Sequence, residues 1–240
     1  MNKFFTFIII LIMCFMCCLC TNNINQIEHI LIDSGVSGPT LLMISGTHGN
    51  EPAGSFGLEK FINSDAKIKK GKLVIIPRVN KLGLFFNTRW GYNGVIPIDY
   101  NREYPNKSNE LAGDYINRQI IEYIKKSDFI IDFHEGWGFN IIEPESMGSG
   151  IYPSDTEIAK SIGQNVLNKL NDTINDSKKK FTINFDSPRI SNTLDSYCNI
   201  IGKNYILIET SGQNNIQPID LRINQVLLTI DTILEELKMI

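Results

Sequence analysis

The chain has 240 residues, a formal net charge of −3 and 42% hydrophobic residues. This length is enough for one domain with a well-buried core, and the apolar and charged fractions are those of a globular protein. Nucleic acid is not expected as a partner, because its recognition needs a concentrated basic surface.

The first twenty residues differ from the rest of the chain. Lys3 precedes an uncharged run from Phe4 to Cys20, and polar residues follow at once from Thr21. A helix over this run would be about 25 Å long, slightly less than the roughly 30 Å of hydrocarbon in a bilayer. Residues 1–20 are therefore expected to be a secretory signal peptide. An N-terminal membrane anchor through residues 4–20 is the alternative, because no clear small-x-small cleavage site follows. Either way, a secreted or membrane-anchored, extracytoplasmic protein is expected.

The cysteines give no disulfide framework. Four of the five lie in the N-terminal segment, at positions 14, 17, 18 and 20. Cys198 is then left without a partner for a disulfide inside the domain. Cys20 also allows a lipid-modified N-terminus, although the residues before it match that signal poorly.

Residues 24–240 contain no long linker, repeat or low-complexity tract, so they are predicted to form one domain. Short apolar runs predict buried strands at residues 27–32, 41–45, 73–77, 129–133 and 205–208. Helical patterns are found at residues 51–63, 111–125, 155–170 and 221–237. Strands that alternate with helices of this length predict an α/β domain with a mixed, largely parallel central sheet flanked by helices. Such sheets bind ligands beyond the carboxyl ends of their strands.

Two of the three histidines stand at predicted strand ends, next to glycine. His48 follows the strand at 41–45, and His134 follows the strand at 129–133. Glu51 is three residues after His48, across a strand-to-helix turn, so both side chains can reach one ion. Two imidazoles and one carboxylate leave the fourth position of a zinc ion open, which is an established catalytic arrangement. Each residue alone also has a structural explanation, such as an acid at a helix N-terminus. Their joint occurrence at strand ends favours a metal site.

Several acids lie near these ligands. Asp132 is two residues before His134 and faces the same side of the strand, where it either orients a ligand histidine or is only a polar strand end. Glu209 follows an apolar strand, and burial beside a metal would shift its pKa toward a value that suits a general base. Glu135 and Glu143 are alternative bases. Glu135 ranks lower, because it points away from His134 if the strand continues.

Two arginines are candidates for binding a carboxylate or a carbonyl oxygen. Arg102 follows Asn101 in a segment rich in Gly, Asn and Pro. An arginine binds a carboxylate through two parallel hydrogen bonds, and an adjacent amide can supplement them. Arg89 is a second cation upstream. Surface solubility is the alternative explanation, and it suits Arg89 better than Arg102.

Together these residues resemble the zinc carboxypeptidase superfamily, and within it the succinylglutamate desuccinylase and aspartoacylase branch. Residues 46–51 (Gly-Thr-His-Gly-Asn-Glu) are close to the ligand motif of that branch. Residues 99–102 (Asp-Tyr-Asn-Arg) resemble its Asp-Leu-Asn-Arg motif, and residues 132–134 (Asp-Phe-His) resemble its segment with the third ligand. The resemblance covers about residues 40–212.

The resemblance implies a zinc hydrolase domain with one zinc ion per chain. It implies the metal ligands His48, Glu51 and His134, the catalytic residues Glu209 and Arg89, and the substrate-binding residues Asn101 and Arg102. The expected reaction is hydrolysis of an amide bond next to a free carboxylate, in an N-acyl amino acid or a peptide.

Three features depart from that branch. Aspartoacylases usually carry a further C-terminal β domain, whereas one predicted helix follows Glu209 here. Residues 101–105 also look like the Asn-Arg-x-Phe-Pro of true carboxypeptidases, and a signal-like N-terminus is unusual for cytosolic deacylases. A secreted metallocarboxypeptidase acting on peptides or peptidoglycan stems is therefore one alternative. A non-catalytic zinc- or carboxylate-binding module is another, and the retention of all three ligands and Glu209 argues against it.

Overall fold

A computed structural model describes residues 26–93, 95–185 and 189–240. The predicted signal peptide or anchor at residues 1–20 lies outside the described residues, as do four of the cysteines. Among the helices that the structure describes, none is long and apolar enough to cross a bilayer.

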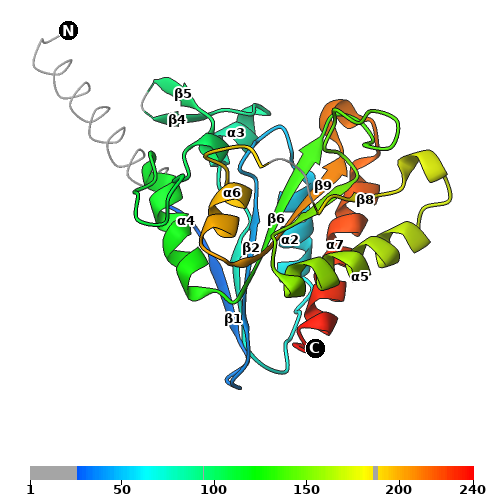
Figure 1. The fold of residues 1–240 in the computed structure, drawn as a ribbon, viewed down its shortest axis with the longest axis horizontal. Helices are drawn as coiled ribbons and strands as arrows, with labels where there is room; N and C mark the ends of the chain where they lie inside the picture. Colours follow the sequence, from blue (N-terminus) through cyan, green and yellow to red (C-terminus); the bar gives the residue numbers. More distant parts are fainter. Residues whose placement is uncertain (1–25, 94, 186–188) are drawn as a thin grey trace, which may run out of the picture.

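A seven-stranded sheet runs through the centre of the domain (Figure 1). In order across the sheet, its strands are β1 (Ile30–Asp33), β3 (Lys72–Ile76), β2 (Thr40–Ser45), β6 (Phe129–Gly136), β9 (Asn204–Ser211), β7 (Gly150–Pro153) and β8 (Thr182–Ile183). The four neighbours β3, β2, β6 and β9 are parallel to one another. Strand β1 is antiparallel to β3, and β7 is antiparallel to β9. The predicted mixed, largely parallel sheet is confirmed.

Helices cover both faces of the sheet (Figure 1). One face packs against α2 (Ala53–Ile62), α5 (Glu157–Asp172) and α7 (Ile219–Glu236), and the other against α4 (Tyr115–Lys126) and α6 (Leu194–Ile200). Strand β2 contributes side chains to the hydrophobic core on each face. Leu41 and Met43 belong to the core under α2, α5 and α7, whereas Leu42 and Ile44 belong to the core under α4 and α6. Successive side chains of a strand point to opposite faces, so a strand buried on both faces is apolar throughout.

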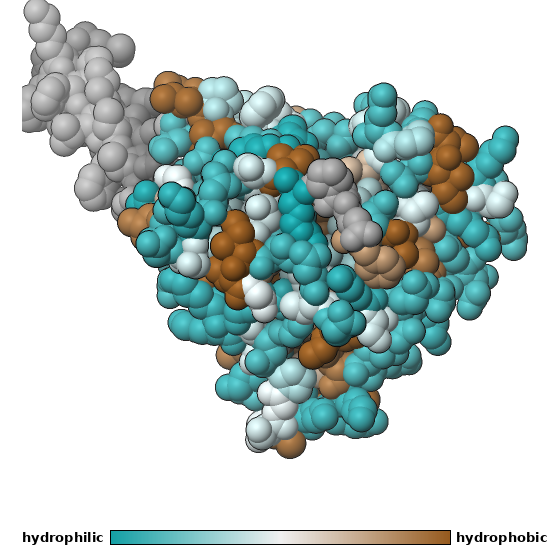
Figure 2. All heavy atoms as spheres, in the orientation of Figure 1, coloured by the Kyte–Doolittle hydropathy of each residue, from teal (hydrophilic) through white to brown (hydrophobic). Residues whose placement is uncertain are grey.

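The face of the molecule seen in Figure 2 is mostly polar. Figure 2 shows hydrophilic residues over most of one face of the molecule, with hydrophobic residues in separate patches. The large apolar side chains of β2, β6 and β9 are instead buried. The domain is therefore held together mainly by the two cores between the sheet and its helices.

The five predicted strands and four predicted helices are all present, with shifted ends. The helix predicted from residue 111 begins at Tyr115, because the Asp114 side chain accepts a hydrogen bond from the Ile116 N–H and caps it. Such a cap stabilises a helix by about 1 kcal/mol. The predicted strand at 27–32 is shorter, since only residues 30–33 pair with β3.

Several short elements were not predicted. They are α3 (Lys81–Phe86), the hairpin of β4 (Gly91–Asn93) and β5 (Ile96–Ile98), the strands β7 and β8, the helix α6 and the 3₁₀ turns Tyr100–Arg102, Ser177–Lys179 and Gln213–Asn215. The segment around residues 91–105 therefore has more regular structure than its Gly, Asn and Pro content indicates.

The parallel strands bring the motif residues to one edge of the sheet. Ser45 at the end of β2 pairs in register with Phe133 of β6, and His134 of β6 pairs with Glu209 of β9. Since the carboxyl ends of these strands lie together, segments far apart in the sequence meet at this edge (Figure 1).

Candidate active site

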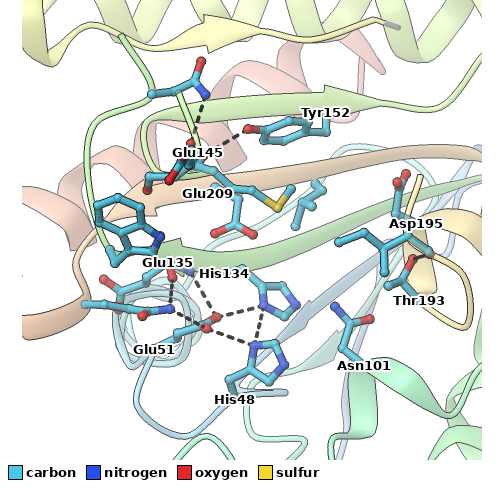
Figure 3. A pocket seen from close by; sticks show the side chains of 18 of the residues that line it. His48, Glu51, Asn101, His134, Glu135, Glu145, Tyr152, Thr193, Asp195 and Glu209 are labelled. Carbon is cyan, nitrogen blue, oxygen red and sulfur yellow. Dashed lines mark hydrogen bonds and ion pairs between the residues drawn. The ribbon is translucent and has the colours of Figure 1, made fainter. Parts of the chain in front are cut away.

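Three side chains meet at the carboxyl edge of the sheet and could hold a metal ion. The Nδ1 atom of His48 is 2.9 Å from Oε1 of Glu51, and the Nδ1 atom of His134 is 2.8 Å from Oε2 of Glu51. The two Nδ1 atoms are 3.1 Å apart (Figure 3). All three residues are buried, and their ligand atoms lie within 4.8 Å of one another. The structure thus brings the three predicted metal ligands together.

The turn between β2 and α2 carries two of the ligands and requires glycine. Gly46 has a φ of +72°, a left-handed conformation that favours glycine. A Cβ atom on Gly49 would lie 1.8 Å from the carbonyl carbon of Gly83, which no other residue could accommodate. These two glycines, one on each side of His48, let the chain turn tightly between β2 and Glu51.

An aspartate lies next to the Nε2 atom of each histidine, within hydrogen-bond geometry for His48 and as an ion-pair contact for His134. Nε2 of His48 is 3.0 Å from Oδ1 of Asp99, and Nε2 of His134 is 3.3 Å from Oδ2 of Asp132. Tyr205 donates a hydrogen bond to the same Asp132 oxygen. Such contacts fix the tautomer and the ring orientation of a metal-binding histidine. The geometry therefore favours the orienting role for Asp132 over that of a simple polar strand end.

The charge of this cluster fits a cation. With the Nε2–H of His48 directed at Asp99, the Nδ1 atom of His48 turns a lone pair toward the Glu51 carboxylate. Burial alone would lower the pKa of His134, but Asp132 and Glu51 raise it well above its usual value. The buried carboxylates thus favour positive charge at this point. Two imidazole nitrogens and one carboxylate form a donor set that zinc accepts.

The structure places Arg89 next to the ligands. Its Nε and Nη2 donate hydrogen bonds of 3.0 and 2.8 Å to Oδ2 of Asp99. Its Nη1 lies 3.3 Å from Nδ1 of His48 and 3.6 Å from Oε1 of Glu51. Asp99 therefore positions both a histidine ligand and this arginine. Surface solubility does not describe an arginine that is held against a buried cluster.

Glu209 is the acid that best fits a base at this site. It is buried, lines the same pocket and neighbours His134 across the β6–β9 pair (Figure 3). Burial raises the pKa of Glu209 to about 8. Glu135 also lines the pocket, but its carboxylate is engaged elsewhere, since it accepts a hydrogen bond from the Ala53 N–H and pairs with Arg222. Glu143 accepts from the Phe139 N–H and does not line the pocket.

The raised pKa of Glu209 predicts how metal-free stability varies with pH. The pKa of this carboxyl is about 8 in the folded protein against an ordinary value of 4.5, so the folded state binds the proton more tightly. The folded state is therefore destabilised as the pH rises from 4.5 toward 8. In the presence of a chelator, Glu209→Gln should unfold at a higher temperature than the unchanged protein. This difference should widen between about pH 5 and about pH 8 in thermal unfolding experiments. If the difference in unfolding temperature between the two proteins stays constant over this range, the pKa of Glu209 is not raised in the folded state.

The cluster opens into a pocket of about 450 Å³. Asn101 and Arg102, the residues predicted to bind substrate, line this pocket. The Oδ1 atom of Asn101 accepts a hydrogen bond from the Leu194 N–H at 3.0 Å, which fixes the orientation of its amide. Arg102 is exposed, and its Nη1 donates to the carbonyl of Asn101 at 2.6 Å.

Other parts of the pocket wall were not identified from the sequence. These residues are Trp137, Asn140, Pro144, Glu145, Ser146, Met147, Tyr152, Asn184, Ile190, Thr193, Asp195, Leu207 and Gln213. Most come from the β6–β7 loop, from β7 and from the segment before α6, which carry no recognisable motif. The contact of Asp99 with His48 and Arg89 was not predicted either, although Asp99 could have been identified because it is the first residue of the Asp-Tyr-Asn-Arg motif.

Residues 37–139 match the model of the succinylglutamate desuccinylase/aspartoacylase catalytic domain. The resemblance to this family is confirmed. The match includes His48, Glu51, Arg89 and His134 and ends before Glu209. The assignment of Glu209 therefore rests on its burial, its place in the pocket and its pairing with His134, and not on this match. The search of curated proteins gave no match.

Solved structures share the fold of this desuccinylase/aspartoacylase-like chain. A variant of the cell shape determinant protein Csd4 from Helicobacter pylori has a TM-score of 0.72 at 20% identity, over 89% of this chain and 55% of that one. The ectoine utilization protein EutE (DoeB) from Ruegeria pomeroyi has a TM-score of 0.64 at 14% identity, over 89% of this chain and 61% of that one. An aspartoacylase family protein from Mesorhizobium loti has a TM-score of 0.62 at 17% identity, over 89% of this chain and 62% of that one. The zinc carboxypeptidase-like fold is confirmed.

These structures are longer than the present chain. It spans about half of the length of the Csd4 chains, with 55% covered in the first of them. The likeness therefore concerns the fold of this α/β domain.

Proposed function

We propose that this protein is a zinc-dependent hydrolase that cleaves an amide bond next to a free carboxylate. The convergence of His48, Glu51 and His134 in a pocket that also contains Glu209 and Arg89 supports the proposal. These three ligands would hold one zinc ion, which when bound activates water and polarises a carbonyl group at neutral pH.

Glu209 acts as the general base and acid. Its carboxylate takes the proton of the attacking water and then donates it to the amine that leaves. In the metal-free protein burial raises the pKa of this carboxyl, whereas a cation bound beside it would lower the pKa toward the working pH, where proton transfer is most effective. Its place beside His134 on the neighbouring strand puts this carboxylate at the same edge as the ligands.

Arg89 stabilises the negative charge that develops on the carbonyl oxygen. Asp99 holds two of its guanidinium nitrogens, so that Nη1 is left facing the ligand cluster. A donor that is already oriented toward developing charge costs no reorganisation during the reaction. Asn101 and Arg102, on the same pocket wall, bind the free carboxylate of the substrate.

Replacing Arg89 with methionine should lower kcat by about 10²- to 10³-fold, the usual loss when one oxyanion donor is removed. The matched control is Arg78→Met, because Arg78 pairs with Glu59 at the surface. Steady-state kinetics on an N-acyl amino acid would measure both variants. Equal losses in the two variants would remove Arg89 from the reaction.

The substrate defines two versions of this function. The leading one is an N-acyl amino acid deacylase, which the match to the desuccinylase/aspartoacylase catalytic domain supports. The second is a carboxypeptidase acting on peptides or peptidoglycan stems. It is favoured by the likeness to Csd4, which is described as a D,L-carboxypeptidase and has been solved with a tripeptide and with mDAP.

A panel of zinc-loaded assays tests both versions and the enzyme class itself. N-acetyl and N-succinyl amino acids are compared with short peptides that end in a free carboxylate. Faster hydrolysis of the acyl amino acids supports the deacylase, and faster release of a terminal residue supports the carboxypeptidase. If the protein binds zinc but hydrolyses none of these compounds, the result supports the non-catalytic binding module.

We also propose that residues 1–20 direct the protein out of the cytoplasm, as a cleaved signal peptide or as an anchor through residues 4–20. The uncharged run after Lys3 supports this. N-terminal sequencing of protein expressed in its full length separates the two: a new N-terminus near residue 21 indicates cleavage, and an intact one in the membrane fraction indicates an anchor.

A further inference from the structure

The turn that follows β9 makes a contact with the ligand cluster that the proposed function does not use. This turn, Gln213–Asn215, comes four residues after Glu209. Gln213 donates a hydrogen bond of 3.0 Å from Nε2 to Oε1 of Glu51. The same nitrogen donates to the backbone carbonyl of Glu135 at 2.7 Å. Gln213 thus joins the end of β9 to a ligand from the start of α2.

Both carboxylate oxygens of Glu51 accept hydrogen bonds from groups other than the two histidines. Oε1 accepts from Gln213, and Oε2 accepts from the backbone N–H of Glu135 at 3.2 Å. One fixed donor on each oxygen restricts rotation of the carboxylate group. The lone pairs that remain face the Nδ1 atoms of His48 and His134. Glu51 is therefore oriented before any ion binds, which lowers the entropy lost when the ion is bound.

The turn itself is fixed by a buried ion pair. Arg222 on α7 pairs with Glu135 and donates from Nη2 to Oδ1 of Asn215 at 3.1 Å. A Cβ atom on Gly212 would lie 1.4 Å from Oε2 of Glu135, so only glycine lets the turn approach this pair. Asn214 and Asn215 have positive φ values of 60° and 57°, which asparagine tolerates better than most residues. The chain thus adopts a demanding conformation that presents Gln213 to Glu51.

From these contacts we propose that Gln213 is a positioning residue for the metal ligand Glu51, held in place by the Glu135–Arg222 pair. The inference rests on the proposed function, because it assumes that Glu51 binds the ion. Gln213 strengthens metal binding through Glu51 and does not itself coordinate the ion. Outer partners of metal ligands typically contribute 10- to 100-fold in affinity.

The test measures metal binding without substrate. Gln213→Met keeps the length of the side chain and removes its N–H donors. Gln213→Asn keeps the amide but is one methylene shorter, so it falls short of Glu51. The control Asn214→Gly changes the neighbouring exposed residue and retains the positive φ of the turn. Thermal unfolding in the presence of a chelator shows which variants are folded before Zn²⁺ is added.

Competition with a chromophoric chelator gives the Kd for Zn²⁺, and the visible spectrum of Co²⁺-loaded protein reports the geometry of the ligands. Both Gln213 variants should bind Zn²⁺ about 10- to 100-fold more weakly and show an altered Co²⁺ spectrum. Asn214→Gly should match the unchanged protein in both measurements. If either folded Gln213 variant keeps the original Kd and spectrum, Gln213 does not position Glu51.

A comparison of Zn²⁺ binding by the unchanged protein and by His134→Ala shows whether a negative result overturns only the role of Gln213 or also the proposed function. If the two bind Zn²⁺ equally, the ion is not bound by the predicted ligands, and both proposals are overturned. If His134→Ala loses binding while Gln213→Met retains it, only the inference about Gln213 is overturned.

Discussion

Glu209→Gln is expected to lower kcat/KM for amide hydrolysis by about 10²- to 10⁴-fold, the usual contribution of a positioned acid–base group. The amide has nearly the size of the carboxyl group but cannot accept and return the proton. Because Glu209 is not among the metal ligands, the variant should bind one zinc ion as the unchanged protein does. Zinc content by mass spectrometry and steady-state kinetics on the best substrate of the panel measure the two effects separately.

The matched control for this variant is Glu143→Gln. Glu143 was an alternative base on sequence grounds, yet its carboxylate accepts the Phe139 N–H and does not line the pocket. Its replacement should leave the rate nearly unchanged. The assignment of the base is wrong if Glu209→Gln stays fully active with zinc bound, or if Glu143→Gln loses as much activity.

The convergence of the three proposed metal ligands was predictable because three chemical signals coincide with strand ends. Each of the three residues follows the end of an apolar run. His48 and Glu51 lie between the predicted strand at 41–45 and the predicted helix from residue 51, and His134 comes directly after the run at 129–133. In a parallel sheet such ends lie on one edge, so residues separated by more than eighty positions can be expected to meet. Alternation along the strand also correctly placed Asp132 with His134, and Glu135 on the opposite face.

The orienting contacts of the site could not be predicted in the same way. Whether Asp99 reaches both His48 and Arg89 depends on how the segment after the β4–β5 hairpin packs against the β2–α2 turn. Gln213 reaches Glu51 because of a turn that a buried arginine from α7 stabilises. Neither contact follows from residue type and spacing, since both depend on tertiary packing.

The short elements were missed for a related reason. Strand β7 has four residues between Gly150 and Pro153, too few to show a period. It forms because it pairs with β9 and is buried on both sides, so tertiary context overrides weak local propensity. Helix α6 has seven residues, and Thr193 caps it. These elements supply Tyr152 and Asp195 to a pocket wall that comes mostly from loops, and this is why the sequence indicated the proposed metal site better than the substrate.

His134→Ala should abolish stoichiometric zinc binding and, with it, hydrolysis. It removes one of three ligands, and it leaves the buried Asp132 and Glu51 carboxylates without the imidazole that both contact. An unpaired buried carboxylate is costly, so this variant should also unfold at a lower temperature than the unchanged protein. His29→Ala is the matched control, since His29 is exposed and contacts Tyr123 away from the pocket. Zinc content, kinetics and thermal unfolding should all be nearly unchanged in that control. Full zinc content in His134→Ala would contradict the proposed centre, because two protein ligands rarely retain a zinc ion through purification whereas three do so in catalytic sites.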